Sequence, residues 1–330
     1  MSQVPMPAYV NRVGRQVLRP PILCQNVALH GFMFAADANV LQDLCDTYLN
    51  RPSGGRLRFV PLVPRVVTLW ARTGRLQSAD PRDRDLGWMT EIDVAFWVPV
   101  AEVDPAGGSS RPRRLAWFQP FIFVDSVAAL DTGREVYGYP KQLGQFTLPQ
   151  GVADADLFAV DTQVWEHPGP DCPLQMGRLF EIRRTGGAPA GAGLAETWDD
   201  LEGAFRALAR LFFGAGGKLS LASVELLIDV FEYLHSGAVE SVFLKQFRDC
   251  ADADYACYQA IVSAAAKVTG FRTAGALAGD YQLTVFPCGS EPIAAALGLG
   301  TGSQPALAAW YVDFDFQLEA GQVEEIGRPA

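Results

Sequence analysis

This 330-residue chain contains fewer basic than acidic residues. It holds 37 Asp and Glu residues against 27 Lys and Arg residues, which gives a formal net charge of −10 at pH 7. Binding to nucleic-acid phosphates and binding to anionic membrane surfaces both need clustered basic side chains. We therefore expect neither a nucleic acid nor a membrane as a partner.

The sequence also lacks long apolar runs and clusters of metal ligands. No segment approaches the roughly 20 uninterrupted apolar residues of a membrane helix, and residues 1–16 contain no apolar core of a secretory signal. The six cysteines form no C-x-x-C pair, and only three histidines occur, at positions 30, 167 and 235. We predict a cytoplasmic protein with free thiols and no metal site.

Lysine is the rarest basic residue apart from histidine. It occurs only at Lys141, Lys218, Lys245 and Lys267. Chemistry that requires a primary amine therefore has few candidates. With 49% hydrophobic and 19% charged residues, the composition is that of a globular protein with a sizeable core.

Alternating apolar residues predict a mainly β or α+β fold. Residues 91–100 alternate strictly, which places Glu91 and Asp93 on one face of a strand. Residues 115–124 form a second aromatic and β-branched run. Both runs carry apolar side chains on both faces, which favours a barrel or sandwich over an open sheet. Further strands are predicted at residues 256–268, 281–286 and 310–316.

Residues 194–236 are predicted to form a helical hairpin after the glycine-rich linker 186–193. Leu201, Phe205, Leu208 and Phe212 recur at helical spacing, and a second helix is expected after Ser220. Exposed aromatic residues on this hairpin, at positions 205, 212 and 213, suggest a homo-oligomer.

Lys141 is the most informative candidate for chemistry. It lies in the segment GREVYGYPKQLG, residues 133–144, directly after Tyr139 and Pro140. Burial among apolar groups lowers the pKa of an amine, and a neutral amine attacks a ketone to form a Schiff base. The alternative is a solvated lysine on a turn after proline.

The segment containing Lys141 resembles the signature of the acetoacetate decarboxylase family, with Lys141 at the position of its Schiff-base lysine. Residues 86–91, LGWMTE, resemble the stretch that holds its catalytic glutamate, here Glu91. Residues 281–299 and 305–317 resemble its last strands. The resemblance implies one domain over residues 1–330, a largely antiparallel β-barrel or cone with peripheral helices and an insertion at about 194–236.

The same resemblance implies a lyase that decarboxylates acetoacetate or a larger β-keto acid through a covalent imine on Lys141, without a further cofactor. Gln142 replaces the family's second lysine, and residues 26–31 lack the arginine that the family places near its N-terminus. These differences favour a larger keto compound. The residues predicted to contact the substrate are Tyr139, Trp88, Arg134, Phe123 and Asp93, although for Arg134 an ion pair with Glu135 is the alternative.

Two other functions remain open from the sequence. The same lysine could catalyse aldol or dehydration chemistry on pyruvate-like substrates, which the missing arginine and Gln142 favour. A barrel could instead bind a small apolar or keto ligand without turnover, and Lys141 would then titrate normally.

Overall fold

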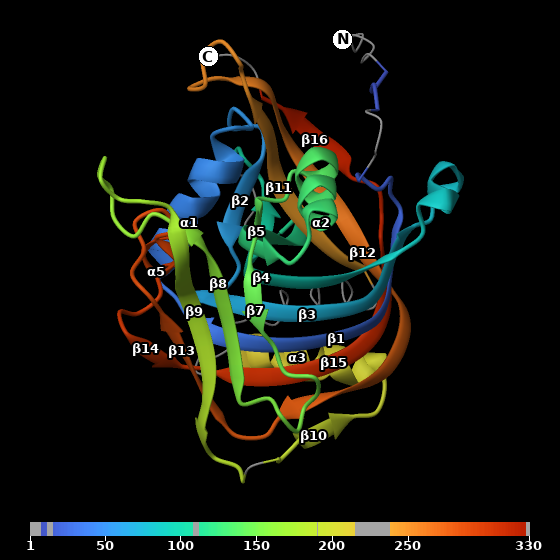
Figure 1. Ribbon diagram of the computed structural model, residues 1–330, viewed down its shortest axis with the longest axis vertical. Helices are drawn as coiled ribbons and strands as arrows, with labels where there is room; N and C mark the ends of the chain where they lie inside the picture. Colours follow the sequence, from blue (N-terminus) through green and yellow to red (C-terminus); the bar gives the residue numbers. More distant parts are fainter. Residues whose placement is uncertain (1–7, 12–15, 108–111, 190, 215–237, 328–330) are drawn as a thin grey trace.

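The computed structural model describes residues 8–11, 16–107, 112–189, 191–214 and 238–327, and strands dominate this part of the chain (Figure 1). They form two sheets, one large and strongly curved, the other small. The prediction of a mainly β or α+β protein is therefore confirmed. The second helix of the predicted hairpin lies outside the described residues.

The large sheet curls until it nearly closes into a ring. Strands β4, β3, β1, β15, β12, β11 and β5 pair in this order, and β5 also pairs with β4. The described pairings are antiparallel except those of β5 with β11 and β6. The strands of this sheet are β1 (Ile22–Ala35), β2 (Arg58–Pro61), β3 (Arg65–Ser78), β4 (Met89–Val103), β5 (Arg114–Val124), β6 (Lys141–Leu143), β10 (Leu194–Trp198), β11 (Ala238–Arg248), β12 (Ala256–Leu277), β15 (Ala308–Leu318) and β16 (Gln322–Ile326).

The small sheet covers the outer face of β1, β3 and β4. Its core contacts are aromatic: the ring centroids of Trp70 and Phe158 lie 5.4 Å apart, and those of Phe96 and Phe180 lie 4.8 Å apart. Packing on this outer face leaves the inner face of the ring available for a cavity. The small sheet consists of β7 (Gln145–Thr147), β8 (Leu157–Val164), β9 (Gln175–Gly186), β13 (Asp280–Val285) and β14 (Ser303–Pro305).

Short helices connect the strands, and one longer helix carries an apolar stripe. The Asp37 carboxylate caps α1 by accepting hydrogen bonds from the backbone N–H groups of Asn39 and Val40. The helical segments are α1 (Ala38–Cys45), η1 (Asp46–Asn50), η2 (Pro81–Leu86), α2 (Val127–Thr132), η3 (Gly133–Tyr137), α3 (Leu201–Gly214) and α5 (Ile293–Leu297).

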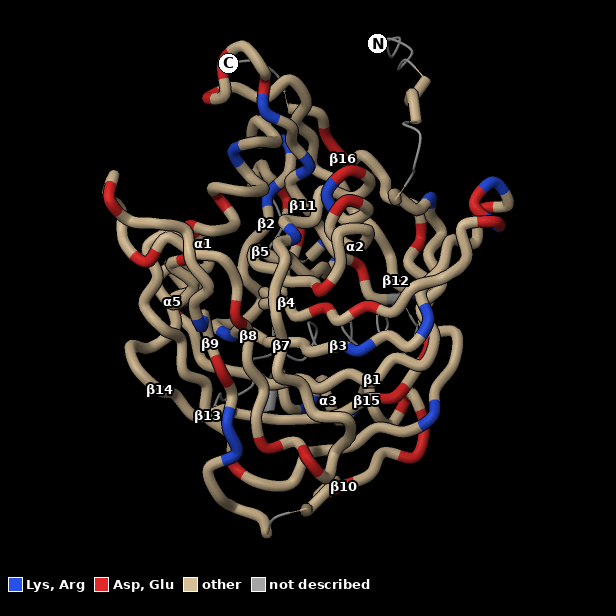
Figure 2. The backbone as a smooth tube through the Cα atoms, in the orientation of Figure 1, with Lys and Arg blue, Asp and Glu red and all other residues tan. Residues whose placement is uncertain are grey.

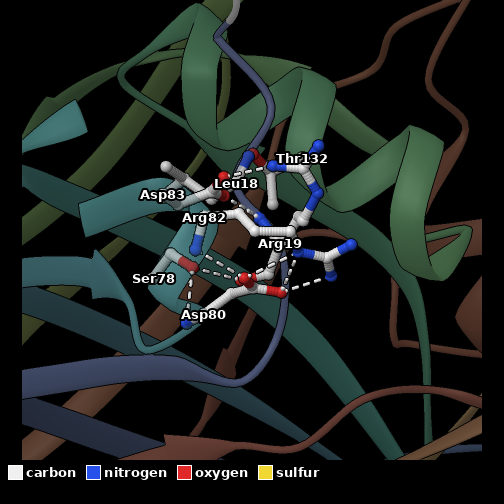
Figure 3. A network of polar contacts seen from close by, with 7 residues as sticks. All are labelled: Leu18, Arg19, Ser78, Asp80, Arg82, Asp83 and Thr132. Carbon is white, nitrogen blue, oxygen red and sulfur yellow. Dashed lines mark hydrogen bonds and ion pairs between the residues drawn. The ribbon is translucent and has the colours of Figure 1, made fainter. Parts of the chain in front are cut away.

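A polar network fixes the chain before β1 (Figure 3). The buried Asp83 carboxylate accepts a hydrogen bond from the Arg19 backbone N–H at 2.7 Å and forms an ion pair with the Arg19 guanidinium. The Leu18 N–H donates to the Thr132 hydroxyl at 3.1 Å. These contacts attach the chain before β1 to both η2 and α2.

The predicted hairpin is only partly what the sequence suggested. Helix α3 confirms the first helix, but residues 194–198 form strand β10, which pairs with β12. Gly275 on β12 explains this pairing, because a Cβ there would lie 2.1 Å from the Glu196 carbonyl oxygen. Phe205 and Phe212 face the interior of the ring. They therefore give no support to a homo-oligomer, which stays a prediction.

Charged residues of both signs are scattered over the backbone, on strands as well as on loops (Figure 2). No helix in the described ranges has the length and apolar character needed to cross a membrane.

Candidate active site

Local backbone geometry directs Lys141 into the ring. The segment η3 ends at Tyr137, and the next residue, Gly138, has a φ of 91° in the left-handed region that glycine tolerates best. The chain then enters β6, where Lys141 pairs with Ile122 of β5. A Cβ on Gly133 would lie 2.5 Å from the Lys141 Cδ. The absence of a side chain at position 133 therefore makes room for the lysine stem.

Two carboxylates of β4 hold the Lys141 amine. Its Nζ lies 2.7 Å from the Glu91 Oε1 and 3.2 Å from the Asp93 Oδ2. Strand alternation puts both carboxylates on one face, as the sequence predicted, and in the structure this face points into the ring. The Lys141 and Glu91 side chains keep only 10% and 8% of their surface accessible, whereas Asp93 keeps 29%. Asp93 is thus the carboxylate more open to a ligand.

The charges of Glu91 and Asp93 control the protonation of Lys141. Burial alone would lower the pKa of the amine, but Glu91 and Asp93 outweigh burial and hold the pKa above its usual value. The prediction that desolvation lowers the pKa of this lysine toward neutrality is therefore wrong. Burial, together with repulsion from Glu91, raises the pKa of Asp93 to about 6, against the attraction of Lys141.

Aromatic side chains form the floor beneath the amine. The Lys141 Nζ lies 5.7 Å from the centre of the Tyr139 ring, which lies 4.0 Å from that of Phe243. Burial raises the pKa of the Tyr139 phenol, and it raises that of the neighbouring Cys24 thiol well above its usual value. Both groups are therefore neutral. The charges of this region are those of Lys141, Glu91 and Asp93, which together form the ion cluster.

The ion cluster opens into a cavity of about 350 Å³ inside the ring. Its walls come from β1, β3, β4, β5, β11, β12 and β15, and α3 adds one further wall. Among the described residues that line it, Lys141 is the only Lys, Arg or His. Gln119 and Ser241 also line it, and the Gln119 amide donates to the Ser241 hydroxyl at 3.0 Å. The sequence analysis missed this pair, which comes from two strands far apart in the chain.

The predicted site residues divide into two groups. Lys141, Glu91, Asp93 and Tyr139 all line the cavity. Trp88, Phe123 and Arg134 are not among its lining residues. Whether any of these residues acts in catalysis or binding stays a prediction.

Each residue of the second group has a contact elsewhere. The Trp88 side chain is exposed, and its ring lies 5.6 Å from the Arg75 guanidinium carbon. Phe123 is buried in the core against the small sheet. Arg134 donates to the Lys141 carbonyl at 3.4 Å, which supports the backbone of the lysine rather than its amine.

No arginine takes the place of the missing one in the described cavity lining, and the basic residues Arg19, His30 and Arg72 lie outside it. The Arg72 guanidinium donates to the Leu148 carbonyl at 3.1 Å. His30 is buried, and burial lowers the pKa of its imidazole to about 4, so it carries no charge near neutral pH. Arg19 pairs with Asp83. Gln142, which replaces the family's second lysine, donates to Glu291 at 2.9 Å.

The fold matches solved structures of one enzyme group over nearly its whole length. An acetoacetate decarboxylase from Legionella pneumophila has a TM-score of 0.58 and 15% identity, covering 98% of this chain and 94% of that chain. The enduracididine biosynthesis enzyme MppR, in a complex with pyruvate, has a TM-score of 0.53 and 14% identity, covering 94% and 92%. An acetoacetate decarboxylase-like enzyme from Sphingomonas wittichii RW1 has a TM-score of 0.52 and 12% identity, covering 94% and 95%.

Sequence comparison adds no closer relative: no family model and no curated protein matches the chain. The structural matches therefore define the class of fold. This protein has the acetoacetate decarboxylase-like fold, as the resemblance in the sequence implied.

Proposed function

We propose that this protein is a carboxy-lyase that forms a Schiff base between Lys141 and the ketone of a β-keto acid and then releases CO₂. The observation that carries the proposal is the buried Lys141 amine, held by Glu91 and Asp93 at one end of an apolar cavity. A primary amine in a dry pocket is suited to imine formation, and neighbouring carboxyl groups can move the protons that this chemistry requires.

Proton transfer within the cluster starts the reaction. The Lys141 ammonium has to lose a proton before its nitrogen can attack, and Asp93 is the acceptor. Its pKa of about 6 lies close to neutral pH, where a group exchanges protons efficiently. Glu91 keeps the amine in position through the 2.7 Å contact.

Imine formation and decarboxylation then follow. The nitrogen bonds to the ketone carbon, and the ketone oxygen leaves as water with one proton from the amine and one from Asp93. The resulting iminium accepts the electron pair of the bond to the carboxyl carbon, CO₂ leaves, and an enamine remains. A proton from solvent, passed on by Asp93, adds to the enamine carbon, and water releases the ketone and regenerates the Lys141 ammonium.

Electrostatics favour decarboxylation over reactions that retain a substrate carboxylate. In the described lining no cation other than Lys141 is present to bind such a group, and two carboxylates stand nearby. Repulsion from Glu91 and Asp93 raises the energy of the bound substrate carboxylate. This repulsion disappears as the carboxylate becomes neutral CO₂. Only an interaction that differs between ground state and transition state accelerates the chemistry. A pyruvate-like substrate would keep its carboxylate, and this repulsion, throughout.

Borohydride trapping tests the proposal. The protein is incubated with acetoacetate or a longer 3-oxo acid, reduced and digested, and the adduct is mapped by mass spectrometry while CO₂ is measured in parallel. We expect an adduct on Lys141 and CO₂ release. Lys141→Met should lose both, and Lys245→Met is the matched control, since Lys245 is half-buried and donates to the Val136 carbonyl outside the cavity. Adduct formation without CO₂ release would overturn the lyase assignment, and no adduct would overturn the Schiff base.

A further inference from the structure

We infer that the substrate carries a medium-length apolar tail, of about ten carbons, that fills the cavity between Lys141 and an aromatic end wall. This inference rests on the proposed function, because it names the class of β-keto acid that the same site takes. The volume, the helix α3 and the aromatic wall each support it.

The cavity is far larger than acetoacetate needs. Its volume of about 350 Å³ is many times the roughly 10–15 Å³ that a cavity needs to hold one water molecule. It also lies in the range of pockets that enclose drug-sized ligands. A four-carbon acid would leave most of this apolar space filled with water, which is unfavourable beside apolar walls.

Helix α3 presents an apolar stripe to the cavity and no charged residue. The lining positions recur at intervals of three and four residues, so they share one face of the helix. The charged residues Glu202, Arg206 and Arg210 lie on the exposed side. An apolar occupant matches this face. The lining residues of α3 are Leu201, Ala204, Phe205, Leu208, Ala209 and Phe212.

Four aromatic rings from different elements form the end wall. The centroids of Trp97 and Trp117 lie 5.6 Å apart, those of Trp117 and Phe212 lie 5.4 Å apart, and those of Phe212 and Trp310 lie 6.2 Å apart. Gly31 makes room for the last ring, because a Cβ there would lie 2.2 Å from the Trp310 indole. The wall is therefore a packed unit, and it is entirely apolar apart from the indole N–H groups.

Strand geometry sets the length of the tail. Asp93 and Trp97 are four residues apart on β4, which corresponds to about 13 Å along a strand. An extended chain advances about 1.2 Å per bond, taken from three backbone bonds in about 3.5 Å, so about eleven bonds span this distance. A tail of about ten carbons has this length.

A chain-length series tests the inference on the unmodified protein. The value of kcat/KM is measured for unbranched 3-oxo acids of 4, 7, 10, 13 and 16 carbons, which carry tails of 1, 4, 7, 10 and 13 carbons beyond the ketone, and the trapped Lys141 adduct is mapped for each. We expect a rise of about fourfold for each added methylene, since burial of each one contributes favourable transfer free energy, and a plateau or fall beyond a tail of about ten carbons. A flat or falling series from four carbons, with the adduct intact, would overturn the inference and leave the Schiff base standing.

A binding measurement separates failure of the two proposals. Methyl ketones of the same lengths carry no carboxylate, and their binding is followed by quenching of tryptophan fluorescence. If no acid forms an adduct, the proposed function fails, and ketone affinity that rises with length still supports the tail. Affinity that does not rise with length would overturn the tail in that case.

A pair of α3 variants locates the tail. Ala204→Leu fills the cavity and should lower the ratio of kcat/KM for the 13-carbon acid to that for acetoacetate at least tenfold. Ala207→Leu makes the same change on the same helix at a half-buried residue outside the lining, and should leave the ratio within twofold. The placement of the tail would be contradicted if this kcat/KM ratio were the same in both variants and both variants had melting temperatures near that of the unmodified protein.

Discussion

Replacing Glu91 by glutamine tests whether charge controls the Lys141 amine. Two unit charges 2.7 Å apart attract by about 6 kcal/mol at an effective dielectric constant of about 20. Desolvation of the pair cancels much of this gain, and an opposite charge at this range typically changes a pKa by about 1 to 3. Glu91→Gln should therefore lower the pKa of Lys141 by that amount, with Asp93 still in place at 3.2 Å.

The assay is the pH dependence of lysine acetylation. The protein is treated briefly with acetic anhydride at a series of pH values, and modification of Lys141 is quantified by mass spectrometry. Only the neutral amine reacts, so the pH at which the rate is half-maximal reports the pKa independently of access. Lys267, which is more than half exposed, serves as the internal reference for reagent activity. We expect the midpoint for Lys141 to move to lower pH in Glu91→Gln.

Glu102→Gln is the matched control for this prediction. Glu102 is as buried as Glu91 and lies 2.6 Å from the Arg114 guanidinium, but it does not line the cavity. Its replacement should leave the Lys141 midpoint unchanged. If Glu91→Gln also leaves that midpoint unchanged while the protein stays folded, the carboxylate does not control the amine, and the reasoning fails.

Three further predictions concern Asp93 and two glycines. Folding raises the pKa of Asp93 from 3.8 to about 6, so the folded state binds the proton of this carboxyl more tightly than the unfolded state does. The contribution of Asp93 to the free energy of unfolding should therefore fall by up to about 3 kcal/mol as pH rises from about 4 to about 6. Urea unfolding should show this slope in the unmodified protein, and Asp93→Asn should flatten it. Gly133→Ala should displace the Lys141 stem and slow borohydride trapping at least tenfold, while an unchanged trapping rate would show that the stem can move aside. Gly31→Ala should clash with the Trp310 ring and lower the free energy of unfolding by about 1–3 kcal/mol, measured by urea titration.

Local pattern was enough to predict five of the described strands, β4, β5, β12, β13 and β15, but not their neighbours. The alternation in residues 91–100 correctly gives the strand β4 and the shared face of Glu91 and Asp93. The nearly closed ring instead depends on pairings between distant segments, such as β1 with β15 and β5 with β11. Strand β10 was missed for the same reason, because its strand conformation depends on a close approach to Gly275, about eighty residues further on.

Local sequence pattern was also insufficient to predict the surroundings of single side chains in the site. Alternation placed Glu91 and Asp93 together, but the direction of the Lys141 pKa depends on distances of 2.7 and 3.2 Å that no sequence pattern gives. Phe123 was misplaced because it lies next to Ile122 on β5 and therefore faces the opposite side, toward the small sheet. A sequence shows which residues of a strand share a face. Which of the two faces points into the cavity depends on the neighbouring strands.

The two ends of the cavity come from different parts of the chain, which separates reaction from substrate choice. The reactive end is built by β4, η3 and β6, where Gly133 and the carboxylates fix the position of Lys141. The far end depends on α3 and on Trp310 of β15. Substitutions on the inner face of α3 can therefore change the length of tail that fits while the contacts of the lysine stay intact. An apolar wall tolerates such changes better than a buried ion cluster, because a swap of apolar residues alters packing, whereas loss of one carboxylate leaves charges unbalanced.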